Sequence, residues 1–210
     1  FIIHFFLYCM RVLLLGSEGF VGKNLIDGLK DKHELFTADV LDTGSHENYQ
    51  KFDITNLNEV LNLIKDVDVV INLVTHTLTQ SLDDTISNAN TNIIGLLNVL
   101  EACKRNHVKK IIFTSASSII GVPKDFHVTE QHLVIPKTVY GITKMTSEHY
   151  LRLYKEMYDL NYVVFRFFNI YGPHQKNGLI PTFYKKIQKG ESITVFGEGK
   201  QIRDFVYVPD

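Results

Sequence analysis

The segment from Gly16 to Gly22 is the first part of the sequence whose residue types and spacing could do chemistry. It directly follows an apolar run and reads Gly16-Ser17-Glu18-Gly19-Phe20-Val21-Gly22. Glycines allow a sharp turn and a close approach of backbone N–H groups to a phosphate, and the N-terminus of a following helix attracts an anion. Asp39 ends the next apolar run, 17 residues beyond Gly22, where a carboxylate can accept hydrogen bonds from ribose hydroxyls. Either feature alone is also typical of a tight turn or an exposed loop acid, but their order predicts a dinucleotide-binding site.

Tyr140 and Lys144 are the candidates for acid–base chemistry. They are four residues apart in a segment of helical period, so the phenol and the ammonium stand one turn apart on one face. An ordinary Tyr has a pKa near ~10, too high for a general base, but a neighbouring ammonium and a cationic nicotinamide would both lower it. The spacing alone is weak evidence, because both residue types are common here. The position of the pair, downstream of the Ser-rich end of the apolar run at 110–118, favours a catalytic role.

The elements that must position these residues follow from hydrophobic periodicity. Short apolar runs alternate with longer segments of helical period, which is typical of βαβ units around a parallel sheet. Ligands of such a sheet bind beyond the carboxyl ends of the strands, where the candidate residues fall. The sequence therefore predicts an α/β fold with a doubly wound parallel (Rossmann) sheet. Strands are expected at 11–15, 34–39, 68–74, 110–115 and 162–167, and helices at 20–31, 57–65 (capped by Asn56 with Glu59), 87–106 and 138–160.

Composition and charge exclude several classes of function. The chain has 210 residues, a net charge of −1 and no basic block longer than two residues, so nothing indicates binding to nucleic acid or to a membrane surface. Cys9 and Cys103 match no disulfide, metal or redox spacing, and the nine histidines include no HxxxH pair. We therefore expect no metal site, no membrane attachment, and a reducing cytoplasm as the place of action.

The two ends of the chain differ from the middle in their hydrophobic pattern. Residues 1–9 are apolar but much shorter than the ~20 needed to cross a bilayer, and Met10 opens MRVLLLGSEG like a natural start. We interpret 1–9 as an upstream or non-native extension, with an extra strand as the alternative. Residues 10–168 form the predicted dinucleotide-binding domain. After Phe168 the periodicity changes and a short helix is expected at 179–189, so 169–210 is interpreted as the start of a smaller substrate-binding lobe, cut short at Asp210.

Longer motifs extend these local patterns and occur in one order along the chain. They are Gly16-x-x-Gly19-Phe20-x-Gly22, Phe52-Asp53-Ile54, Asn92-x-x-Gly95, Ile111-Ile112-Phe113-Thr114-Ser115, Tyr140-x-x-x-Lys144, Arg166-Phe167-Phe168-Asn169-Ile170-Tyr171-Gly172-Pro173 and Phe196-Gly197-Glu198-Gly199-x-Gln201-x-Arg203-Asp204-Phe205-Val206-Tyr207-Val208. From Met10 to Asp210, the chain thereby resembles the extended short-chain dehydrogenases/reductases. Within them it is most similar to the NAD-dependent nucleotide-sugar epimerase/dehydratase group, as in UDP-glucose 4-epimerases.

The resemblance implies a role for each matching residue. Tyr140 would be the catalytic base, and Lys144 would bind the nicotinamide ribose while tuning Tyr140. Asn169 and Arg203 would hold the nucleotide diphosphate of a sugar donor, a task that suits the Arg fork. Without the resemblance, a turn-forming Asn and a surface ion pair with Asp204 would be the simpler interpretations. The implied NAD-binding residues are Gly16, Gly19, Phe20, Val21, Gly22, Asp39, Asp53 and Ile54 (these two at the adenine), Tyr140 and Lys144.

The sequence departs from the family pattern beside the expected base. The family usually places a Ser or Thr five residues before the Gly of its SSxxxYG-like segment, where this chain has Ala116. Ser115, Ser117 and Ser118 are the neighbouring hydroxyls. We favour Ser118 as the catalytic hydroxyl, because some family members carry Gly in the earlier slot and Thr at the position of Ser118. Two further departures are Ile120 in place of a common Tyr and Val74-Thr75-His76 in place of a small pair.

We therefore expect an NAD-dependent nucleotide-sugar epimerase, with a 4-epimerase of a UDP-sugar as the commonest activity of the group. The sugar would be oxidised to a keto-sugar, turn over, and receive the hydride on its other face. A dehydratase or 4-keto-sugar reductase on the same fold is the first alternative, and a non-catalytic dinucleotide-binding module is the second. Related dehydratases carry an Asp-Glu pair directly after their catalytic Thr, whereas residues 115–121 contain no carboxylate. That difference favours the epimerase.

Two further expectations concern the cofactor and the assembly. NAD is expected rather than NADP, because Asp39 would repel a 2′-phosphate and no Arg lies within 34–50 to bind one. By resemblance, we expect a homodimer formed through the helices at 87–106 and 138–160. Their outer faces would present apolar residues, although the same residues could instead face the sheet; they are Leu97, Leu100, Leu151 and Tyr154.

Overall fold

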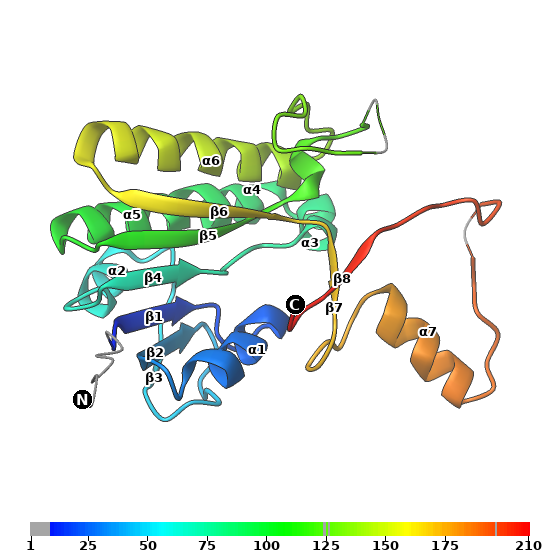
Figure 1. Ribbon diagram of the computed structural model, residues 1–210, viewed down its shortest axis with the longest axis horizontal. Helices are drawn as coiled ribbons and strands as arrows, with labels where there is room; N and C mark the ends of the chain where they lie inside the picture. The colour runs from blue at the N-terminus through cyan, green and yellow to red at the C-terminus, as the bar shows by residue number, and fades with distance from the viewer. Residues whose placement is uncertain (1–8, 124, 126, 196) are drawn as a thin grey trace, which may run out of the picture.

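A computed structural model describes residues 9–123, 125, 127–195 and 197–210, so residues 1–8 of the expected extension and Phe196 of the last motif lie outside the described residues. Its centre is a parallel six-stranded sheet with the order β3-β2-β1-β4-β5-β6 (Figure 1). The chain reverses direction across the sheet between β1 and β4, where a doubly wound sheet opens to a ligand. The expected fold class is thus confirmed. The strands are β1 Arg11–Leu15, β2 Glu34–Asp39, β3 Tyr49–Lys51, β4 Val69–Asn72, β5 Lys110–Ala116 and β6 Asn161–Phe167.

Helices cover the two faces of this sheet unequally. α2, α5 and α6 pack over one face, on a core that includes Leu13 and Val70, whereas α1 packs over the other face, on Val12 and Leu14. Neighbouring strand residues point to opposite faces, so a strand that is buried on both sides appears as a continuous apolar run. Within the described part of the chain, no helix is both long and apolar enough to cross a membrane. The longer helices are α1 Phe20–Leu29, α2 Leu57–Leu63, α5 Gly95–Arg105, α6 Val139–Tyr158 and α7 Leu179–Gln188.

The long helix expected at 87–106 is divided into three parts. α4 (Thr85–Ala89) leads into a π-helical turn, η1 (Asn90–Ile94), before α5 begins. The buried Asn92 side chain in this turn holds the loop after β4, because His76 N donates to Asn92 Oδ1 at 2.8 Å and Asn92 Nδ2 donates to His76 O at 3.0 Å. Single π-turns are frequent at functional sites, and this one links the helix to the loop beside the expected base.

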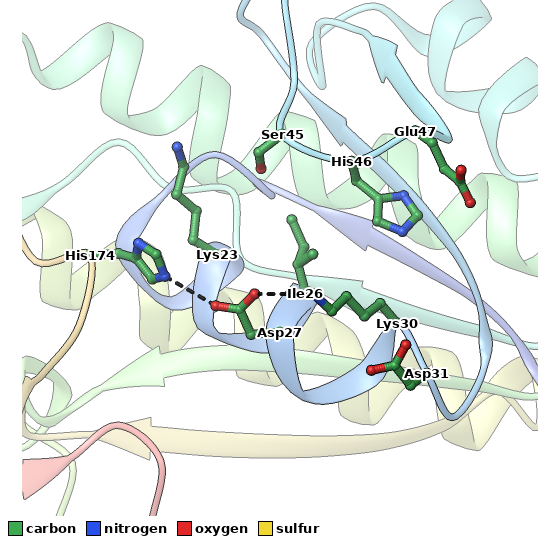
Figure 2. A pocket seen from close by; sticks show the side chains of 9 residues that line it. All are labelled: Lys23, Ile26, Asp27, Lys30, Asp31, Ser45, His46, Glu47 and His174. Carbon is green, nitrogen blue, oxygen red and sulfur yellow. Dashed lines mark hydrogen bonds and ion pairs between the residues drawn. The ribbon is translucent and has the colours of Figure 1, made fainter.

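After β6 the chain leaves the main sheet and forms a small parallel pair, β7 (Asn169–Tyr171) with β8 (Phe205–Tyr207), while α7 stands apart from the main sheet (Figure 1). α1 holds the segment after β7 directly. Asn24 Nδ2 donates to Pro173 O at 2.8 Å. Asp27 Oδ2 lies 3.1 Å from His174 Nε2 (Figure 2). The helix that starts at the glycine turn is therefore also the helix that anchors the second part of the chain.

The outer surfaces of α5 and α6 differ from the expectation. Leu100 and Leu151 are 0% and 1% exposed and belong to the core, so their expected place on an outer face was wrong. Both helices pack against the sheet and against each other, which buries these two positions. Tyr154 packs against the same core, and Leu97 is half-buried. The apolar side chains that α6 exposes near its end are Leu153, Met157 and Tyr158.

Candidate active site

A cleft of about 910 Å³ opens at the carboxyl ends of the central strands. Its walls are the glycine turn before α1, the end of β2, the loop after β4, the end of β5 and the start of α6. In the described part of the chain, no three His, Cys, Asp or Glu side chains are grouped as a metal ion would require. Every candidate site residue named from the sequence lines this cleft: Gly16, Gly19, Phe20, Val21, Gly22, Asp39, Asp53, Ile54, Ser118, Tyr140, Lys144, Asn169 and Arg203.

Gly16 and Gly22 occupy positions of the turn where a side chain would be strained or would clash. Gly16 has a φ of +81°, and a Cβ on Gly22 would lie 2.5 Å from the carbonyl oxygens of both Gly16 and Ser17. Because Gly19 is the N-cap of α1, the first N–H groups of this helix have no side-chain cap. A diphosphate at the turn would accept hydrogen bonds from such donors, and the helix dipole favours its charge. The turn therefore fits the pyrophosphate of a dinucleotide.

Asp39 provides the carboxylate expected at the adenosine ribose. Its Oδ2 accepts a hydrogen bond from Glu18 N at 2.9 Å, and its Oδ1 accepts one from Val40 N at 2.7 Å. These bonds fix the carboxylate and leave lone pairs on both oxygens for ribose hydroxyls. Among the described residues that line the cleft, the Lys and Arg side chains are Lys144 and Arg203, which lie on α6 and before β8 rather than beside β2. This lining fits NAD.

Asp53 and Ile54, which follow β3, form the neighbouring part of the wall. Thr55 N and Thr55 Oγ1 donate to Asp53 Oδ1 at 2.9 and 2.7 Å, which orients the carboxylate. Ile54 is buried and packs against α5, where a Cβ on Gly95 would come within 2.8 Å of Ile54 Cγ2. The Gly of the Asn92-x-x-Gly95 motif thus lets α5 approach the loop that lines the adenine end.

Lys144 is buried beside Tyr140 at the start of α6. Its Nζ donates to Thr114 O at 2.7 Å and lies 4.6 Å from the centre of the Phe113 ring and 5.7 Å from that of the Tyr140 ring. Burial lowers the pKa of Lys144 to about 7, and the negative charge of Glu148 opposes this shift. The phenol is therefore paired with an amine that titrates near neutral pH.

The pKa of Tyr140 lies above its usual value in the structure, and the lowering expected from Lys144 together with a cationic nicotinamide stays a prediction. Burial raises the pKa of the Tyr140 phenol, and a hydrogen bond with the Thr75 side chain opposes the rise. The Lys144 ammonium lies 5.7 Å from the centre of the Tyr140 ring and donates its hydrogen bond to the Thr114 carbonyl. A second positive charge in the cleft would favour the phenolate.

Two hydroxyls beside Ala116 are buried without a hydrogen-bond partner among the described residues. They are Ser115 Oγ and Ser118 Oγ, and both residues line the cleft. A buried hydroxyl without a partner is costly, so a ligand that bonds to it gains affinity. Ser118 packs against the start of α6, where a Cβ on Gly141 would lie 2.5 Å from Ser118 O. This packing keeps Ser118 beside Tyr140.

A polar cluster behind Tyr140 was missed in the sequence. Thr75 Oγ1 lies 3.3 Å from Asn92 Oδ1, to which it donates, and Asn92 Nδ2 donates to Thr143 Oγ1 at 3.1 Å. Thr143 Oγ1 in turn donates to Asn88 Oδ1 at 3.1 Å. The cluster joins the loop after β4, the π-turn and α6. The sequence offered two signals for this cluster, the Asn92-x-x-Gly95 motif and the unusual Thr75. Neither signal shows that Asn92 contacts Thr75, 17 positions away, or Thr143, 51 positions away.

Asn169 and Arg203 come together at the edge of the cleft. Arg203 Nη1 donates to Asn169 Oδ1 at 3.4 Å, and Asn169 Nδ2 donates to Asp204 O at 2.9 Å. Arg203 also lines a second hollow of about 800 Å³, whose walls include Leu179 and Phe183 of α7. The guanidinium therefore lies where the cleft and the hollow beside α7 share a wall.

The cleft combines a glycine turn for a diphosphate, a carboxylate for a ribose and a Tyr–Lys pair at the start of a long helix. On a parallel sheet, this combination defines a dinucleotide-dependent enzyme of the short-chain dehydrogenase/reductase type. Residues 12–210 match the model of the NAD dependent epimerase/dehydratase family, and the chain belongs to this family. It is thus an enzyme of the NAD-dependent epimerase type, with NAD as its cofactor.

Relatives and solved structures agree with this assignment. The chain is 33% identical to a putative UDP-glucose 4-epimerase of Methanocaldococcus jannaschii, over 95% of this chain and 70% of that protein. It is 30% identical to the UDP-glucose 4-epimerase of Mycolicibacterium smegmatis, over 96% and 70% of the two chains. The UDP-glucose 4-epimerase of Thermotoga maritima, solved with UDP-glucose, superposes with a TM-score of 0.87 at 30% identity, over 95% of this chain and 70% of the other. A dTDP-glucose 4,6-dehydratase of Streptomyces venezuelae shares the fold at 22% identity.

Proposed function

We propose that this chain catalyses epimerisation at C4 of a UDP-sugar. The observation that carries the proposal is the distribution of carboxylates in the cleft. Among the described lining residues, the carboxylates are Asp39, which ends β2, and Asp53, which follows β3, and both lie at the adenosine side. The side with Tyr140 and Lys144 presents hydroxyls instead, from Thr114 to Ser118.

This distribution favours epimerisation over dehydration. Removal of water across C5 and C6 needs an acid for the leaving hydroxyl and a base for the C5 proton. Ordinary seryl hydroxyls cannot supply both near neutral pH, because their protons are held too tightly. Epimerisation needs one proton-transfer group and a hydride carrier, and the cleft provides a place for both.

Tyr140, Lys144 and Ser118 have separate roles in the proposed reaction. NAD, held by the glycine turn and Asp39, would supply the hydride acceptor and donor and a positive ring that favours the Tyr140 phenolate. Tyr140 takes the proton of the sugar hydroxyl and later gives it back. Lys144 orients the phenol and binds the ribose next to it, for which its ammonium must leave the Thr114 carbonyl or share it. Ser118 donates a hydrogen bond to the reacting sugar oxygen.

The sugar nucleotide would span the two hollows. Arg203 and Asn169 offer donors to a diphosphate, and the hollow beside α7 has room for a nucleoside. Two relatives, at 33% and 30% identity, are named as UDP-glucose 4-epimerases, another at 30% is a UDP-glucuronic acid decarboxylase, and a 31% identical solved structure is a UDP-N-acetylglucosamine 4-epimerase. We therefore propose UDP as the carrier. Residues 10–168 would form the NAD domain, and 169–210 part of the substrate lobe.

We also propose that two copies of the chain form a homodimer through α5 and α6. The small molecule that each copy binds besides NAD would be a nucleotide sugar. Cys9 and Cys103 are unpaired, which suits the reducing cytoplasm.

Turnover with defined sugar nucleotides tests the proposed function. The full-length protein with NAD is incubated with UDP-glucose, UDP-N-acetylglucosamine and dTDP-glucose, and the products are followed by NMR and mass spectrometry. The expected product is a C4 epimer of unchanged mass from a UDP-sugar. A product lighter by one water would show a dehydratase, and bound NAD whose oxidation state never responds to any sugar would favour a non-catalytic module.

A further inference from the structure

Glu18, inside the glycine turn, connects three elements at the adenosine end of the cleft. Its backbone N donates to Asp39 Oδ2 at 2.9 Å. Its side-chain Oε1 accepts hydrogen bonds from Ser45 N at 2.7 Å and Ser45 Oγ at 2.8 Å, and its Oε2 lies 3.1 Å from Lys23 Nζ on α1. One residue thus ties the turn to the carboxylate at the end of β2, to the loop that follows, and to the first helix.

Both carboxylate oxygens of Glu18 have partners, and the side chain is largely buried. Its side chain is 6% exposed, whereas that of Lys23 is 31% exposed. The hydrogen bonds from Ser45 and the charge of Lys23 hold the pKa of Glu18 below its usual value, although burial acts in the opposite direction. Lys23 and Ser45 line the same hollow (Figure 2), and neither lines the NAD cleft. The Lys23 ammonium is therefore held on the outer side of the turn.

A second lysine near the end of β2 is also paired with an acid, in an ion pair that is exposed to solvent. Lys51 on β3 lies opposite Asp39 in the strand register, and its Nζ is 2.5 Å from Asp42 Oδ1. A phosphate on the 2′-oxygen of the adenosine ribose would come close to Asp39 and would need a free cation there. Both nearby lysines are already paired with acids, Lys23 with Glu18 and Lys51 with Asp42.

We propose that Glu18 is a second residue that sets the preference for NAD over NADP, by keeping the Lys23 ammonium away from the adenosine ribose while it fixes Asp39. Asp39 repels a 2′-phosphate directly, whereas Glu18 acts through Lys23 and Asp39. The proposal rests on NAD binding by the family and not on the epimerase reaction.

The test compares the affinities of the full chain for NADH and NADPH, measured by their fluorescence on binding, with no sugar present. Glu18→Gln keeps an oxygen that can accept from Ser45 but removes the charge that holds Lys23. We expect the ratio of NADPH to NADH affinity to rise about tenfold at low salt, and the rise to shrink with added salt. Adding Lys23→Met to Glu18→Gln should return the ratio to that of the parent, because it removes the released cation.

Glu47→Gln is the matched control, since Glu47 is an exposed acid of the same loop region and does not line the NAD cleft. It should leave the ratio unchanged. A ratio that stays within twofold of the parent in Glu18→Gln, or that rises equally in Glu47→Gln, overturns the proposal. Lys23→Met alone keeps the test decisive if Glu18→Gln does not fold, because the unpaired Glu18 carboxylate should then lower the ratio, and an unchanged ratio contradicts the proposal. Since turnover is not measured, failure here is separate from failure of the epimerase assignment.

Discussion

At the scale of single residues, Tyr140 is the group on which the proposed proton transfer depends. Tyr140→Phe removes the phenolic oxygen but keeps the ring that lines the cleft, so NAD binding should remain. Turnover should fall by ~10²- to 10⁴-fold, the usual worth of a positioned general base. NADH fluorescence measures the binding, and conversion of a UDP-sugar measures the turnover. Parental turnover in Tyr140→Phe would refute the assigned role.

Lys144 affects both function and stability, because it is a buried amine without a carboxylate at hydrogen-bond distance among its described contacts. Lys144→Met should weaken NAD binding and slow turnover, yet stabilise the fold near neutral pH, because burying an ammonium without a counter-ion carries a desolvation cost that Met does not. The folded pKa of about 7 lies below the unfolded value of 10.5, so the unfolded chain binds more protons between these pH values. The stability of the parent should therefore rise with pH from about 7 to 10.5.

Thermal unfolding across that pH range checks this prediction. The stability advantage of Lys144→Met over the parent should be largest at pH 6 to 7 and shrink as the pH increases. Lys110→Met, at an exposed position on β5, provides the control for loss of a lysine from the surface. An advantage that is constant with pH would show that the buried amine does not lose its charge.

The candidate residues that the sequence identified are those with a distinctive type and a local context. The glycine turn, Asp39 and the Tyr140–Lys144 pair could be found because each follows or opens an element with a strong hydrophobic pattern. Thr75 could not be assigned a partner, because its contacts depend on how the loop after β4 meets η1 and α6. The pKa of Tyr140 also could not be predicted, since spacing along a helix says nothing about the cost of burial.

At the scale of elements, strands buried on both faces were the easiest to predict. β1 and β2 were predicted to the residue, because Arg11–Leu15 and Glu34–Asp39 are apolar runs with clear boundaries. β3 was missed, because this strand has only three residues and they are largely exposed. The π-turn at Asn90–Ile94 was missed, because the apolar face continues through it while the hydrogen-bonding pattern changes.

The contacts between α1 and the segment after β7 predict how the second part of the chain is held. Asp27→Ala removes the partner of His174, and Asn24→Ala removes the donor to Pro173 O. With both changes, amide hydrogen exchange in residues 169–178 should become about tenfold faster, which corresponds to the loss of ~1 to 1.5 kcal/mol from exposed polar contacts. UDP binding should weaken, whereas NADH binding should not change.

Asp31→Ala serves as the control, because Asp31 is an exposed acid on the same side of the hollow in Figure 2 and no dashed contact joins it to His174. Its exchange pattern should match that of the parent. Equal exchange in the double variant and the parent would mean that other contacts position β7 and β8.

At the scale of the whole molecule, the structure changes which residues could form the expected dimer. Leu100 and Leu151 are core residues and cannot contribute. Leu153 and Met157 are four residues apart on α6, are 42% and 58% exposed, and therefore form one apolar ridge on its outer side. Tyr140 and Lys144 lie at the other end of this helix, so an interface on the ridge would leave the cleft open.

Leu153→Asp combined with Met157→Asp should convert a dimer to a monomer at micromolar concentration, because each change buries a charge against an apolar surface of the partner. Sedimentation velocity measures the conversion, and NADH binding should persist, since the cleft is built within one chain. Ile187→Asp on α7 is the matched control: Ile187 is 62% exposed but lies on the second part of the chain, so the dimer should remain. A parent chain that already sediments as a monomer would contradict the dimer. A double variant that stays dimeric would place the dimer contact elsewhere on the surface. The ridge on α6 would then be an apolar surface that the fold tolerates in water.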